Sequence, residues 1–399
     1  MFTREELAKY AQTLWWGLTT ARTKPYAKGD AILLRFDQGA TELAEAMYDL
    51  LIEQGMLPVP RQNLTSAMEL SFYGKGGETQ IKAVPPGERE LMENLSGLIS
   101  LIAPASLTHL SGVDPAKIGL SAVARKFLRE IMDEREQTGA FGWTLCAYPT
   151  PEQARCAGLT IEQYAGQIKR ACFLDHPDPV AQWRRVHAEV TRVKEALAGF
   201  DIARLHIESE HCDLFVTPGE KRRWLGVSGH NIPSFEVFLS PDWRGTEGVY
   251  YADQPSYRSG NLVRGVRLTF RAGRVVAATA EEGGDFVNKQ LAMDEGAAQL
   301  GEFSLTDRRH SKIGAFMAST LFDENYGGEN GNCHVAVGAS YADTYAGDQS
   351  ELDAARKERL GFNDSALHWD LVNTEDKTVT ALLAGGGSAV IYKSGEFTL

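Results

Sequence analysis

The chemistry and much of the fold are decided by four blocks: LGEFSL (300–305), LFDEN (321–325), CHVAVGASY (333–341) and SALHWDLV (365–372). Each block places acidic, imidazole or phenol side chains among small and apolar residues. An ionised group is costly to desolvate in such surroundings unless an opposite charge lies beside it. The candidate functional residues in these blocks are Glu302, Glu324, His334, Tyr341, His368 and Asp370.

A pair of divalent metal ions would supply the missing positive charge. Mixed Glu, Asp and His donors suit zinc, cobalt or manganese better than calcium. Residues two apart on a strand point to the same face, so His368 and Asp370 could bind one or two ions together. Glu236, in NIPSFEVFLSP (231–241), is a further candidate ligand. These residues indicate a two-metal hydrolase.

Each candidate also has a structural alternative when it is taken alone. Glu302 and Glu324 could be helix-cap or surface carboxylates, and an HxD triplet is common on surfaces. His334 lies in a Val/Ala/Gly run, where a hydrogen-bonded core histidine is the usual finding. Glu236 could be the exposed position of an alternating strand. No single residue is decisive.

Two other patterns resemble functional motifs. His206, Glu208 and Glu210 alternate in LHIESEH (205–211), but HExxH spacing is missing, so a solvated strand face is favoured. The glycine cluster GKGG (74–77) follows no strand and precedes no GK[ST], so it predicts a turn and not a phosphate-binding loop.

Composition places the chain among globular proteins. A length of 399 residues favours two domains, and a net charge of −12 argues against nucleic acid or an anionic membrane as partner. Five cysteines without a CxxC pair fit reduced thiols. With no signal-like N-terminus and no long apolar run, a cytoplasmic protein is expected.

The first half of the chain alternates strands and helices. Residues 3–20 predict a helix with Thr3 and Glu6 as a capping box, followed by a strand at 31–36 and a helix at 41–54. This order predicts an α/β domain over residues 1–200 with a mostly parallel sheet.

The second half has a different pattern. Short alternating runs, such as 263–270 and 274–279, are separated by glycines, and RAGR (271–274) predicts a hairpin turn. We therefore expect an α+β catalytic domain over residues 201–399, rich in mixed and antiparallel β-structure.

The order and wording of these blocks resemble the M29 family of metallo-aminopeptidases, the thermophilic aminopeptidase T type. NIPSFEVFLSP, DEGAAQLGEFSL (294–305), LFDEN, CHVAVGASY and SALHWDLV follow one another as in that family. AYPTPEQARCAGLTIEQY (147–164) and DHPDPVAQWRRV (175–186) resemble its N-terminal domain. The similarity covers nearly the whole chain.

The resemblance implies a dinuclear metal site, with Glu302 between the two ions and Tyr341 beside them. It also implies that the N-terminal domain roofs the active site and takes part in packing a homodimer. The implied metal ligands are Glu236, Glu302, Glu324, His334, His368 and Asp370.

The implied activity is removal of N-terminal amino acids from peptides that have a free amino terminus. Glu302 or Glu324 would take a proton from the attacking water, and Tyr341 would donate a hydrogen bond to the oxyanion. The other ring N–H of His334 and of His368 should be held by a neighbouring group. The alternatives are a metallo-amidase or esterase with the same site, or a non-catalytic metal-binding protein.

Three features depart from the family pattern. Phe235 stands where the family usually has glycine before its first glutamate. The segment NYGGENGNC (325–333) is longer than in many members. The tract 343–363 is also long, and it could form a partly helical lid or rim.

Overall fold

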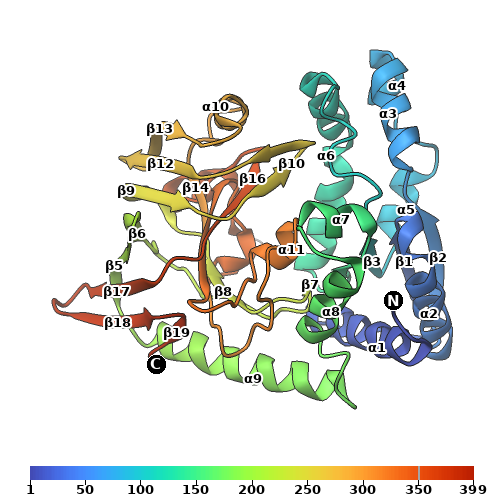
Figure 1. The fold of residues 1–399 in the computed structure, drawn as a ribbon, viewed down its shortest axis with the longest axis horizontal. Helices are drawn as coiled ribbons and strands as arrows, with labels where there is room; N and C mark the ends of the chain where they lie inside the picture. Colours follow the sequence, from blue (N-terminus) through green and yellow to red (C-terminus); the bar gives the residue numbers. More distant parts are fainter. Residues whose placement is uncertain (349–350) are drawn as a thin grey trace. The chain divides into compact units, whose positions relative to one another are not determined.

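The computed structural model describes residues 1–348 and 351–399 (Figure 1). These residues form two compact units. No helix among them is both long and apolar enough to cross a membrane. The first unit comprises Met1–Trp183 and Ser228–Pro233, and the second comprises Arg184–Val227 and Ser234–Leu399.

The first unit is built on a parallel five-stranded sheet in the order β2-β1-β3-β4-β7. Parallel neighbours require crossover connections, which the intervening helices supply. The elements are α1 (Arg4–Ala21), β1 (Ala31–Phe36), η1 (Gln38–Ala40), α2 (Thr41–Glu53), β2 (Leu57–Gln62), α3 (Ser66–Lys75), α4 (Glu78–Lys82), α5 (Glu88–Asn94), β3 (Gly97–Ile102), α6 (Pro115–Gln137), β4 (Gly142–Ala147), α7 (Pro151–Cys156), α8 (Ile161–Ala171) and β7 (Asn231–Ile232).

Helix α1 begins as its sequence predicts. The Thr3 hydroxyl accepts a hydrogen bond from the Glu6 backbone N–H at 3.2 Å, and the Glu6 carboxylate accepts one from the Thr3 N–H at 2.7 Å. These two bonds satisfy donors that a helix start leaves unpaired. Leu7, Tyr10 and Leu14 are buried on one face, so the amphipathic pattern and the cap agree.

The sequence favours a helix over residues 88–101, with a strand as a further possibility over residues 98–103, and in the structure the helix is shorter and the strand is present. Helix α5 ends at Asn94, and strand β3 begins at Gly97. A Cβ atom on Gly97 would lie 2.8 Å from the hydroxyl of Tyr26, so this glycine allows a close approach. Of the GKGG cluster, Gly74 and Lys75 end helix α3, and Gly76 and Gly77 form the short connection to α4.

The second unit contains an eight-stranded sheet, β13-β12-β9-β6-β5-β17-β18-β19, and a four-stranded sheet, β16-β15-β14-β8. Both are antiparallel, so the predicted fold class is confirmed for both halves. Helix α9 (Pro179–Ala198) contains the division between the units. The other elements are β5 (Ile202–Ser209), β6 (Asp213–Thr217), β8 (Glu236–Leu239), β9 (Asp242–Ala252), β10 (Ser256–Arg258), β11 (Asn261–Val263), β12 (Val266–Arg271), β13 (Arg274–Thr279), α10 (Gly284–Leu291), β14 (Leu300–Thr306), α11 (Thr320–Asp323), β15 (Asn332–Gly338), η2 (Ala342–Thr344), α12 (Ala354–Leu360), β16 (His368–Asn373), β17 (Lys377–Leu383), β18 (Ser388–Lys393) and β19 (Glu396–Phe397).

The LHIESEH segment forms most of β5, an interior strand that pairs with β6 and β17. Glu208 and Glu210 are exposed, as expected for a solvated face. The Nε2 atom of His206 lies 2.8 Å from Asp213, so this imidazole is engaged with the next strand.

The described part of the 343–363 tract is partly helical, with η2 and α12. Its apolar residues form a small buried cluster of Tyr345, Leu352, Leu360 and Phe362. The guanidinium of Arg222 lies 3.5 Å from the ring centroid of Phe362, which adds a cation–π contact. The tract is therefore packed around its own apolar residues.

Asp307, directly after β14, links this strand to the C-terminal β19. Its buried carboxylate accepts hydrogen bonds from the Phe397 N–H at 2.9 Å and from the Arg309 Nε at 2.9 Å. Burial raises the pKa of Asp307, but the bonds from Arg309 and Phe397 outweigh it, so the pKa lies below its usual value.

We expect Asp307→Asn to lower the free energy of unfolding by about 2 kcal/mol at pH 7, because a charge-assisted network is lost. A carboxylate with a lowered folded-state pKa stabilises the protein above its unfolded pKa, about 3.9, and loses this contribution as the pH falls through the folded pKa. The difference between wild type and variant in urea unfolding should therefore shrink below about pH 3.9. A constant difference from pH 7 to pH 3 would contradict this origin of the stability.

Candidate metal centre

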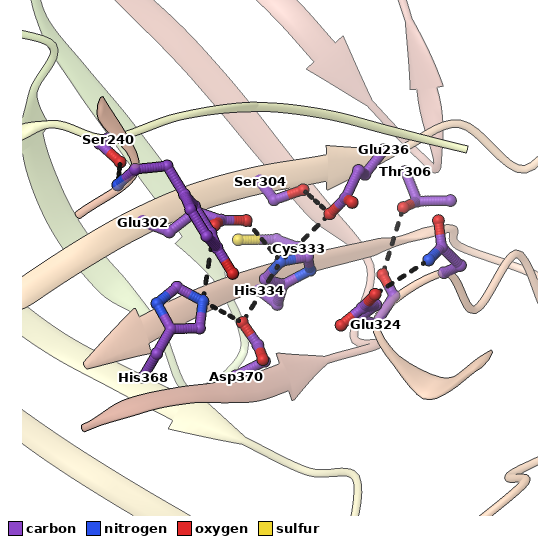
Figure 2. Close-up of polar contacts among 12 residues, drawn as sticks. Glu236, Ser240, Glu302, Ser304, Thr306, Glu324, Cys333, His334, His368 and Asp370 are labelled. Carbon is purple, nitrogen blue, oxygen red and sulfur yellow. Dashed lines mark hydrogen bonds and ion pairs between the residues drawn. The ribbon is translucent and has the colours of Figure 1, made fainter. Parts of the chain in front are cut away.

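The candidate site lies on one face of the four-stranded sheet (Figure 2). On β15, Ala336 pairs with Glu302 of β14 and with Asp370 of β16. Two residues along, His334 pairs with Ser304, so these side chains point to the same face. The methyl group of Ala336 leaves space between the two carboxylates. Asp370 and Glu302 both pair with Ala336, although they are 68 positions apart in the sequence. The register of the strands therefore brings them to the same level of the sheet.

The first group of donors is formed by Glu236, Glu302 and His334, all buried. His334 Nε2 lies 3.1 Å from Glu302 Oε1 and 3.5 Å from Glu236 Oε2. The Glu236 carboxylate also accepts hydrogen bonds from Ser234 Oγ at 3.4 Å and from Ser304 Oγ at 3.3 Å. Strand β8 thus supplies a carboxylate whose orientation is fixed by two hydroxyls.

The second group is formed by Glu302, His368 and Asp370. His368 Nε2 lies 3.3 Å from Asp370 Oδ1 and 3.7 Å from Glu302 Oε2. His368 Nδ1 lies 2.8 Å from the Ala339 carbonyl and donates to it when protonated, which directs Nε2 toward the carboxylates. Glu302 is common to both groups, with a different oxygen facing each imidazole.

His368 therefore has the expected partner for its second ring nitrogen, the Ala339 carbonyl. For His334, the buried Nδ1 atom has no hydrogen-bond partner among the described residues. The ring is held instead by its position on a fully buried strand.

Without bound ions, the electrostatics of the cluster depend on uptake of protons. Burial and the Glu302 carboxylate raise the pKa of Glu236 to about 7. Burial lowers the pKa of His334, but the hydrogen bond to Glu302 and the charge of Glu236 outweigh it and raise the pKa to about 9. Burial also lowers the pKa of His368, but the charge of Asp370 and its hydrogen bond to the ring raise it more strongly, to about 9.

Asp370 shows the opposite behaviour. Burial raises its pKa, but the adjacent His368 imidazole lowers it more strongly, to about 2. The cluster thus holds more carboxylates than imidazoles in a buried space, and positive charge is needed to balance them. Two oxygen- and nitrogen-rich donor groups that share one carboxylate fit two divalent cations of the zinc, cobalt or manganese type.

Glu324 lies beside these two groups and belongs to neither of them. It ends the short helix α11, and Figure 2 shows its carboxylate at the side of the cluster. Burial and the carboxylates of Glu236 and Asp370 raise its pKa well above the usual value. Its backbone carbonyl accepts hydrogen bonds from Asn332 Nδ2 at 3.0 Å and from Thr306 Oγ1 at 3.4 Å, which fixes the end of the helix.

Tyr341 lies at the edge of the cluster, on the loop after β15. Its ring centroid is 4.7 Å from that of His368, and its backbone N–H donates to Ser240 Oγ at 2.8 Å. Tyr341 is 38% exposed as a residue, but desolvation of its phenol and the charges of Glu302 and Asp370 raise its pKa above the usual value. The hydroxyl is therefore protonated at neutral pH and can act as a hydrogen-bond donor.

A third group that could hold an ion, Glu210, His211 and Glu375, lies at the surface. The Glu375 carboxylate already accepts hydrogen bonds from Ser209 Oγ at 2.6 Å and from Asn373 Nδ2 at 3.1 Å. Its charge is therefore used within the chain, and this group carries no functional assignment.

Sequence reasoning missed the polar residues that orient the candidate ligands. Ser304 alternates with Glu302 on one strand, and this two-residue period could have identified it. Asn325 follows Glu324 in the LFDEN block, but its contact with Phe235 spans 90 positions and has no local signal.

The fold and this buried cluster define a metal-dependent hydrolase, and the comparison with protein families agrees. The chain matches the family described as thermophilic metalloprotease (M29) over residues 3–397. The chain therefore belongs to the M29 family. The predicted family and the predicted class of enzyme, a metallo-aminopeptidase, are both confirmed.

Similar proteins of this family carry names that fit the assignment. Aminopeptidase T of Thermus aquaticus is 30% identical over 312 residues, which cover 73% of this chain and 74% of that protein. Aminopeptidase AmpS of Bacillus subtilis (strain 168) is 28% identical over 338 residues, 78% of each chain. A solved structure, wild-type AmpT from Thermus thermophilus, has a TM-score of 0.78 at 22% identity and covers 98% of this chain and 100% of its own, which shows the same fold.

Proposed function

We propose that this protein removes N-terminal amino acids from peptides with the help of two divalent metal ions. The observation that carries the proposal is the position of Glu302. One carboxylate oxygen lies 3.1 Å from His334 and the other lies 3.7 Å from His368, so one side chain serves two donor groups. The names of the similar aminopeptidases support the choice of peptides as substrates.

The two ions would be held by the two donor groups, one with Glu236 and His334 and the other with His368 and Asp370. Glu302 would contribute an oxygen to each. When bound, such ions lower the pKa of a water molecule toward neutrality and polarise a carbonyl oxygen. Strands β14 and β15, which carry Glu302 and His334, are paired on both sides, so the directions of these two donors are fixed by the sheet interior.

Proton transfer falls to Glu324 in this proposal. Glu302 faces both imidazoles and is committed to the two donor groups, whereas Glu324 lies beside them. A carboxylate at this position can take a proton from water and later give it to the leaving amine. Burial and the carboxylates of Glu236 and Asp370 raise its pKa when no ion is present, and bound cations would offset the effect of these carboxylates. Its burial also keeps bulk water away from the proton that it carries.

Tyr341 would stabilise the negative charge that develops on the scissile carbonyl oxygen. Its phenol stays protonated at neutral pH, and its loop is fixed by the hydrogen bond to Ser240. A neutral donor held in a fixed position stabilises an oxyanion more strongly than it stabilises the uncharged carbonyl.

The donors around the two ions also favour a substrate with a free amino terminus. Its α-amine would bind one of the ions or a carboxylate beside them, such as Asp370 or Glu236. An acylated amine has no free lone pair and no charge, so it would lose this contact.

We expect peptides with a free amino terminus to be hydrolysed at least about 100-fold faster than the same peptides with an acetylated terminus, since loss of the contact made by the free amine corresponds to about 3 kcal/mol. Release of the first amino acid from matched peptide pairs, followed by chromatography, measures this ratio. Equal rates for blocked and free peptides would favour an amidase that uses the same site.

A further inference from the structure

The side chain of Asn325 connects two elements that carry candidate site residues. Its Oδ1 atom accepts a hydrogen bond from the backbone N–H of Phe235 at 2.6 Å. Phe235 directly precedes Glu236, the first residue of β8. The asparagine side chain therefore fixes the start of the strand that presents the Glu236 carboxylate.

The amide nitrogen of Asn325 is bound to the other element, helix α11. Nδ2 donates to the Leu321 carbonyl at 3.0 Å and to Glu324 Oε1 at 3.4 Å. Asn325 has no solvent-exposed surface, so these bonds do not compete with water. One planar amide thus holds both the backbone beside Glu236 and the carboxylate of Glu324.

We propose that Asn325 is the positioning residue that sets the proton-transfer carboxylate of Glu324 against the metal-binding strand β8. This inference rests on the proposed function, in which Glu324 transfers the proton and Glu236 binds a metal ion. An asparagine suits this position because it accepts on one side and donates on the other. The donated bond directs one oxygen of Glu324, and the accepted bond fixes the backbone that carries Glu236.

The chain offers a matched control at Asn332. This asparagine is also fully buried, and its Nδ2 atom donates to the backbone carbonyls of Glu324 at 3.0 Å and Tyr326 at 2.7 Å. It stabilises the same segment, but these two bonds go to backbone carbonyls and involve neither the Glu324 carboxylate nor strand β8. Loss of Asn332 should therefore destabilise the fold without changing the site.

The test compares Asn325→Ala and Asn332→Ala in the full-length protein loaded with zinc. For Asn325→Ala we expect at least about 10-fold weaker binding of one zinc ion, measured by competition with a chromophoric chelator, and at least about 10-fold lower kcat. KM should stay within about threefold of the wild-type value. For Asn332→Ala we expect zinc affinity and kcat within about threefold of wild type, although the melting temperature falls.

The variant Asn325→Asp distinguishes the contact with the Phe235 N–H from the contact with the Glu324 carboxylate. It also provides the test if the alanine variant does not fold. Aspartate keeps an acceptor for the Phe235 N–H but has no N–H to donate to Glu324. We expect zinc affinity within about threefold of wild type and kcat lower by at least about 10-fold. Wild-type kcat in this variant, or equal losses in the Asn325→Ala and Asn332→Ala proteins, would overturn the inference. A wild-type protein that binds no zinc or releases no amino acid would instead overturn the proposed function.

Discussion

Replacing Glu302 by glutamine should lower peptide hydrolysis by at least about 10³-fold while the fold stays intact. Glu302 is 4% exposed, and its two oxygens face the imidazoles of His334 and His368 separately. Glutamine has the same shape but presents one neutral oxygen and one N–H donor group. It cannot offer a negatively charged oxygen to both donor groups, so at least one ion should bind weakly.

The measurement is kcat with saturating zinc or cobalt, together with metal content and near-UV circular dichroism. Glu208→Gln on the exposed face of β5 is the control for loss of one negative charge, and it should keep wild-type turnover. Near-normal kcat in Glu302→Gln with two ions bound would remove Glu302 from the mechanism.

Local elements of this fold could be predicted because their signals are local. The capping box of Thr3 and Glu6 marks the start of α1, and the apolar run 31–36 becomes β1. The end of α5 is not marked in the sequence, where residues 98–101 fit either the end of a helix or the start of a strand, and it is pairing with β1 that makes this segment strand β3. Pairing partners that are far apart in the chain leave no periodic signal.

The strand β5 illustrates the same limit. Its alternation correctly predicts a strand with an exposed face, but β17 pairs with it across more than 160 positions. Whether a strand lies at an edge or inside a sheet depends on which distant segment pairs with it. The alternation within one strand shows only which of its two faces is apolar.

The site could be predicted in its residue types but not in its geometry. Acidic and imidazole side chains within apolar blocks indicated a cation site, because burial of such groups needs compensation. Glu302 belongs to both donor groups because of the register of β14 with β15. Glu324 lies beside these groups because it follows the short helix α11. Asn325 shows that a neutral residue beside a candidate acid can matter as much as the acid.

Removal of metal should abolish activity to below about 1% of the starting rate, and zinc, cobalt or manganese should restore it. The buried donors lack enough internal positive charge, since the pKa of Glu236 rises to about 7 and that of His368 to about 9 when no ion is present. The apo site therefore takes up protons at the positions where cations would bind. The measurement is amino-acid release after exhaustive dialysis against a chelator, before and after each metal is added back.

The same titration should change stability, because ions that bind only the folded state shift the unfolding equilibrium. At a metal concentration about 1,000 times the Kd, the gain is about 4 kcal/mol, so the apo protein should melt at least about 5 °C lower. Two outcomes separate the readings of the cluster. Recovery of melting temperature without recovery of turnover would indicate a structural metal site, whereas full activity after chelation would exclude metal-dependent hydrolysis. Recovery of both in parallel, with two ions per chain, is the result that the proposed two-ion site predicts.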